Sequence, residues 1–114
     1  MAAVVYLVND LFFAAKIEET AAQLGVAAER AGDPAALAAA ARSARLAVVD
    51  LRRPDALDAL DRLRATAPDV RAVGFIDHEN VDGIEAARAR GCGTVLSKRK
   101  FAASLPDVLA ACRG

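Results

Sequence analysis

The sequence predicts a three-layer α/β/α fold, a (β/α)5 arrangement with a five-stranded parallel sheet in the order 2-1-3-4-5. Three observations support this class. Short apolar runs alternate with segments of helical spacing along the chain. The runs are continuously apolar, which is typical of strands buried on both faces of a sheet. The length of 114 residues suits one core, so we expect a single domain over residues 1–114.

The predicted strands are short, mostly rich in Val, and bounded by polar residues or Gly. The weakest of them follows Gly25 and is expected to lie at an edge of the sheet. The expected strands cover residues 3–8, 26–28, 46–49, 70–76 and 94–96.

Capping residues predict where the intervening helices begin and end. Asp10 is expected to cap a helix that ends at Leu24, before Gly25. Asp33 followed by Pro34 opens a second helix. The second to fifth helices are expected over residues 34–43, 55–66, 81–91 and a last segment that opens at Ser104-Leu105-Pro106-Asp107.

Charge and composition argue against two classes of function. Fifteen basic residues balance fifteen acidic ones, so no overall field attracts nucleic acid or an anionic membrane. No apolar run approaches the ~20 residues of a membrane span, and no basic segment precedes the first apolar run. We therefore expect a cytoplasmic protein. Cys92 and Cys112 are expected to be free, buried thiols, with one disulfide or a reactive thiol as the alternative.

Polar residues follow three of the predicted strands, at the edge where such sheets bind ligands. The first strand ends in Asn9-Asp10, the third in Asp50, and the fifth in Ser97-Lys98. Neighbouring carboxylates repel unless a cation lies between them, and oxygen ligands suit Mg²⁺. Asp10, Asp50 and Asn9 are therefore the candidate magnesium ligands. A phosphoryl group there would meet a metal, an ammonium group and a carboxylate nucleophile, as an aspartyl phosphate requires.

These residues resemble the receiver domain of two-component response regulators, a CheY-like domain with the flavodoxin-like fold. The resemblance rests on Asn9-Asp10 after an apolar strand, on Asp50 with Pro54 four residues later, and on Lys98 after the last strand. It covers the whole chain in length and element order. It implies that Asp50 is the phosphoacceptor position, that Lys98 is the phosphate-contacting position, and that Asp10 belongs to an acidic metal-binding pair.

Several positions depart from the receiver pattern. Asn9 replaces the first acidic residue, and Ile76 stands where a hydroxyl residue usually contacts the phosphoryl group. Arg99 replaces the Pro that usually follows the lysine, and Val95 replaces a common aromatic residue. Together these changes resemble the degenerate, pseudo-receiver branch, in which phosphorylation of Asp50 is weak or lost and Mg²⁺ binding is weak or absent.

The resemblance implies a stand-alone signalling module, not an enzyme, that acts through contacts with a histidine kinase or a downstream effector. A homodimer is a further expectation, through a face that includes Arg88, Arg90 and Lys100. Two other functions remain open. One is a phospho-accepting receiver in a phosphorelay, and the other is a small flavodoxin-like nucleotide- or cofactor-binding protein. The nucleotide- or cofactor-binding function is disfavoured because residues 10–13 contain no Gly that would let the backbone surround a phosphate.

Structural roles are alternatives for the same side chains. Asp10 could act only as a helix cap, and Asp50 could cap its turn or pair with Lys98. His78, the single histidine of the sequence, could be a solvated loop residue or a ligand near the site.

Overall fold

The computed structural model describes residues 2–113, in which strands and helices alternate as the sequence predicts. The strands are β1 (Val4–Leu7), β2 (Ala28–Arg30), β3 (Leu46–Asp50), β4 (Arg71–Ile76) and β5 (Thr94–Ser97). The helices are α1 (Leu11–Leu24), α2 (Pro34–Ala41), α3 (Ala56–Thr66), α4 (Val81–Ala89) and α5 (Lys98–Ala110). Within residues 2–113, no helix combines the length and the apolar character needed to cross a membrane.

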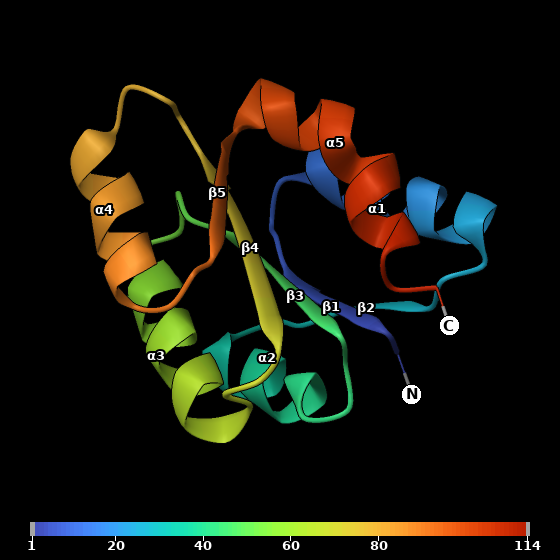
Figure 1. Ribbon diagram of the computed structural model, residues 1–114, viewed down its shortest axis with the longest axis horizontal. Helices are drawn as coiled ribbons and strands as arrows, with labels where there is room; N and C mark the ends of the chain where they lie inside the picture. Colours follow the sequence, from blue (N-terminus) through green and yellow to red (C-terminus); the bar gives the residue numbers. More distant parts are fainter. Residues whose placement is uncertain (1, 114) are drawn as a thin grey trace.

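All five strands form one parallel sheet in the order β2-β1-β3-β4-β5, which confirms the predicted topology (Figure 1). Val4 of β1 pairs with Leu46 of β3, and Leu46 pairs in turn with Arg71 of β4. Since all strands run in the same direction, their carboxyl ends meet at one edge of the sheet.

Helices cover both faces of the sheet, with α1 and α5 on one side and α2, α3 and α4 on the other (Figure 1). Successive strand residues point to opposite faces. Val4 and Tyr6 therefore belong to the core under α1 and α5, whereas Val5 and Leu7 belong to the core under α2 and α3. Burial of β1 and β3 on both faces accounts for their continuously apolar sequences.

Polar caps fix the starts of three helices at the predicted residues. The Asp10 carboxylate accepts hydrogen bonds from the Phe12 and Phe13 amides, and the Asp33 carboxylate accepts one from the Ala36 amide. The side chain of Asn80 caps α4 in the same way. These bonds satisfy amide groups that have no partner within a helix.

The predicted edge strand starts two residues later than expected, at Ala28. Gly25 ends α1 with a left-handed conformation (φ 69°), and the Val26 amide donates to the Ala21 carbonyl at 2.8 Å. Val26 thus completes the turn that ends α1 and cannot join the sheet at the same time.

The last helix begins at Lys98, so the prediction that it opens at Ser104 was wrong. The Ser97 hydroxyl accepts a hydrogen bond from the Lys100 amide at 3.2 Å, and this cap starts the helix directly after β5. Pro106 consequently lies inside α5. Proline has no amide hydrogen, so α5 forgoes one internal hydrogen bond at this position.

Candidate functional site at the carboxyl edge of the sheet

The carboxyl edge of the sheet gathers the charged residues singled out in the sequence. Asp10 follows β1, Asp50 ends β3, Asp77 follows β4 and Lys98 follows β5. Asp50 is 4% exposed and is the one buried charged residue within residues 2–113. A buried carboxylate requires a partner, because leaving water disfavours its charged form.

Arg52 is the partner of Asp50. Its Nε lies 2.9 Å from Asp50 Oδ1 and its Nη2 lies 2.8 Å from Oδ2, which makes a bidentate pair. The Arg52 amide also donates to Oδ1 at 3.0 Å. Both oxygens of the predicted phosphoacceptor position are therefore occupied by one arginine.

The same guanidinium reaches Asp10. Arg52 Nη2 lies 3.2 Å from Asp10 Oδ2, so one cation bridges the carboxylates that follow β1 and β3. Partial burial acts to raise the pKa of Asp10, but hydrogen bonds from Arg52 and from the Phe13 and Phe12 amides outweigh it and hold that pKa below its ordinary value. The pKa of Arg52 is raised, chiefly by its hydrogen bonds to Asp50.

The Arg52 guanidinium packs against two aromatic rings. The Arg52 Cζ atom lies 5.5 Å from the ring centre of Phe13 and 5.4 Å from that of Phe75, within the range of cation–π attraction. Phe75 stacks on Phe101, with ring centres 4.4 Å apart, and Phe101 is fully buried. The position of Arg52 is thus set by α1, β4 and α5 together.

Lys98 has a different partner from Asp50. Its Nζ lies 2.8 Å from Asp77 Oδ1, and this pair lowers the pKa of Asp77. Lys98 is the first residue of α5, and Asp77 is the first residue after β4. The suggested Asp50–Lys98 pair is not formed, because Arg52 takes the carboxylate of Asp50 and Asp77 takes the ammonium group.

The residues at this edge do not fit a magnesium ion in the arrangement described. The Arg52 guanidinium lies between Asp10 and Asp50, where a bridging cation would have to be. Asn9, the third predicted ligand, is exposed. Within residues 2–113, no group of three or more acidic, histidine or cysteine side chains is placed to hold a metal.

The predicted departures from the receiver pattern have structural counterparts. Ile76 is 3% exposed and packs in the core beneath α4, so close to Gly83 that a Cβ there would lie 2.8 Å from the Ile76 Cδ1 atom. Arg99 is exposed on the first turn of α5. His78 is exposed, 3.9 Å from Glu79, and it makes no contact with Asp50 in the described chain.

Both cysteines are free and buried, as predicted. Burial raises the pKa of Cys92 to about 11 and also raises that of Cys112. Since the thiolate is the reactive form, neither residue is suited to nucleophilic chemistry.

Arg52 is a site residue that the sequence did not predict. A signal was present, because a carboxylate at a strand end often accepts a hydrogen bond from the amide two residues later, and a long side chain at that residue can then fold back. Arg53 shows the same local preference, since it forms a bidentate pair with Asp55 at 2.8 and 2.9 Å. Which arginine turned toward Asp50 could not be read from the order of residues alone.

No protein family model and no curated protein matches the sequence. Solved structures do match the fold. A response regulator receiver domain from Rhodospirillum rubrum has a TM-score of 0.72 at 19% identity, over 95% of this chain and 91% of that one. The NtrX receiver domain from Brucella abortus has a TM-score of 0.80 at 21% identity, with 96% of both chains covered.

A third similar structure is the receiver domain of the sensor histidine kinase PA1611 from Pseudomonas aeruginosa, described with a magnesium ion coordinated in its active site cleft. Its TM-score is 0.78 at 19% identity, over 96% of this chain and 95% of that one. Longer NtrX structures are covered over 27% of their length. The chain has the CheY-like fold of response regulator receiver domains, as the sequence motifs predicted.

Proposed function

We propose that this chain is a receiver-type signalling domain, one domain over residues 1–114, which acts by binding another protein and in which phosphorylation of Asp50 is weak or lost. The observation that carries the proposal is the bidentate contact of Arg52 with Asp50. We propose no enzymatic activity for the chain.

Phosphoryl transfer to Asp50 needs a free carboxylate oxygen, a cation that neutralises the phosphoryl oxygens and an available lysine. Both oxygens of Asp50 are bonded to Arg52, and the same guanidinium holds Asp10. Lys98 is bonded to Asp77. Each of these groups would have to leave its present partner before it could take part in the reaction.

The interior near the site is closely packed. Ile76 has no hydroxyl, and it is packed beneath α4. Phe13, Phe75 and Phe101 fill the space under Arg52 and contact one another. Closely packed cores resist small displacements, which supports a module with one resting state.

Apolar side chains at the same edge support a protein-binding role. Within residues 2–113, the large apolar residues that are exposed are Leu11 (75%), Phe12 (60%) and Val81 (57%). All three lie in the first turns of α1 and α4, which begin at this edge. We propose that a histidine kinase or a downstream effector covers this surface, or alternatively a second copy of the chain.

Net charge and cysteine content fit a cytoplasmic protein that binds other proteins. The zero net charge gives nucleic acid no general attraction. The free, buried cysteines fit a cytoplasmic location, where thiols stay reduced.

The test is to incubate the protein with Mg²⁺ and acetyl phosphate, and separately with beryllofluoride, and to follow intact mass and amide chemical shifts near Asp50. We expect no adduct and no Mg²⁺-dependent shift. An adduct that is lost in Asp50→Asn would establish instead a phospho-accepting receiver. A nucleotide or flavin that remains bound after gentle purification would support the cofactor-binding alternative.

A further inference from the structure

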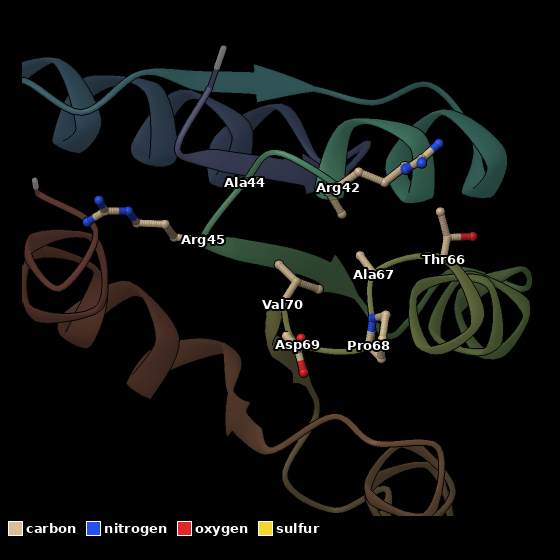
Figure 2. A pocket seen from close by; sticks show the side chains of 9 residues that line it. Arg42, Ala44, Arg45, Thr66, Ala67, Pro68, Asp69 and Val70 are labelled. Carbon is tan, nitrogen blue, oxygen red and sulfur yellow. The ribbon is translucent and has the colours of Figure 1, made fainter.

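The opposite edge of the sheet, where the strands begin, carries a pocket that the proposed function does not use. It is an open pocket of about 520 Å³ between the α2–β3 connection and the α3–β4 connection. Figure 2 shows residues 42–45 of the first connection facing residues 67–70 of the second.

Two arginines flank this pocket and lack acidic partners. Arg42 and Arg45 project from the same connection toward different sides (Figure 2). Arg42 and Arg45 are both exposed, and within residues 2–113 neither forms an ion pair. Other arginines do contact carboxylates: Arg52, Arg53, Arg62 and Arg90.

A third arginine lies beside them. Arg71 begins β4, is exposed, and its amide donates to the Arg45 carbonyl at 3.4 Å. Burial raises the pKa of Cys112, and both Arg71 and Arg45 act against that increase, so the two guanidinium groups lie near the same end of α5. Arg45 and Arg71 are thus two nearby cations without carboxylate partners, and an anion beside them would relieve their mutual repulsion.

Apolar and polar groups contribute about equally to the walls of the pocket. Ala44, Ala67, Pro68 and Val70 line it, and Asp69 is its single carboxylate. A ligand that fits this surface has an apolar group for the pocket and negative charges on either side of it.

We propose that this pocket binds an acidic segment of a partner protein, which places an apolar side chain against Ala67 and Val70 and carboxylates against Arg42 and Arg45. The planar guanidinium group can hold a carboxylate through two hydrogen bonds. Nucleic acid fits less well, because the pocket contains no aromatic ring to stack on a base. The inference is independent of the chemistry at Asp50, since it concerns the other edge of the sheet.

The test uses isotope-labelled protein and a synthetic peptide in which glutamates flank two leucines. We expect amide shifts at residues 42–45 and 67–70, and none when glutamine replaces the glutamates. Arg42→Gln and Arg45→Gln should each weaken affinity about threefold to fivefold, as for exposed ion pairs. Asp69→Asn should strengthen it about twofold, because the variant removes a repulsive charge.

Arg99→Gln is the matched control, since it removes one exposed arginine from the opposite edge and should leave affinity unchanged. Three results would overturn the inference: no shift at the pocket, the same loss of affinity in Arg99→Gln as in Arg42→Gln, or equally strong binding of oligodeoxythymidylate. The last result would identify a general polyanion surface instead. Thermal unfolding of each variant verifies that the fold is retained.

Discussion

The carboxylate of Asp50 is buried at the end of β3, and Arg52 supplies its counter-charge from two residues along the chain. A lone buried charge is costly, and removal of one partner of such a pair generally costs more than the pair contributes. The Arg52 side chain is 29% exposed, so solvent screening reduces the cost of removing it. The pair is thus both a structural requirement and an obstacle to chemistry at Asp50.

Arg52→Gln should lower the free energy of unfolding by about 2 kcal/mol, because Asp50 and Asp10 would repel across the vacated space. The two free carboxylates should then attract Mg²⁺. We expect Mg²⁺ to raise the thermal midpoint of the variant and to leave that of the unmodified protein unchanged.

Arg53→Gln is the control for this prediction, since it removes the same charge and the same kind of bidentate contact, here with Asp55. Its thermal midpoint should not respond to Mg²⁺. An equal response of the unmodified protein would show that Mg²⁺ can displace Arg52. It would contradict the prediction that Arg52 keeps Mg²⁺ from binding between Asp10 and Asp50.

At the level of secondary structure, much of the fold follows from local patterns. Asp10, Asp33 and Asn80 cap helices where the sequence predicts, because a cap needs only the amides of the next few residues. The start of α5 was missed because Ser97 and Ser104 both offer a hydroxyl to a following turn. The helix begins directly after the serine that ends β5. Where β5 ends depends on its pairing with β4.

This difference gives a prediction with an internal control. Ser97→Ala should destabilise the protein by about 1 kcal/mol, since it removes the cap on the Lys100 amide. Ser104→Ala should cost almost nothing, because Ser104 lies inside α5 and Ala is the better helix former. Urea denaturation of both variants measures the two changes, and a larger loss for Ser104→Ala would contradict the assigned start of α5.

For the whole molecule, the topology was predictable and the candidate site was predictable only in part. The order of strands and helices fixed which edge would gather Asp10, Asp50 and Lys98. Their partners depend on which long side chains reach across that edge. Neither the turn of Arg52 over Phe13 nor the Lys98–Asp77 pair follows from spacing in the sequence.

The shared sheet joins the two cores into one cooperative unit. Leu37, on α2, and Leu105, on α5, are fully buried on opposite faces. Leu37→Ala and Leu105→Ala should each destabilise the protein by about 2–5 kcal/mol, and each variant should still unfold in one transition. Leu11→Ala, at a 75% exposed position, should change stability little. Two separate transitions in calorimetry would show that the faces unfold independently.

The guanidinium of Arg52 is covalently tethered two residues from the carboxylate that it neutralises. A tethered group has a fixed effective concentration at its target, whatever the surrounding solution contains. The charge at this edge of the sheet therefore stays nearly constant as the level of free divalent ions changes. Under the proposed function, a cell would adjust the output of such a domain through its abundance and its access to partners, as it does with a scaffold.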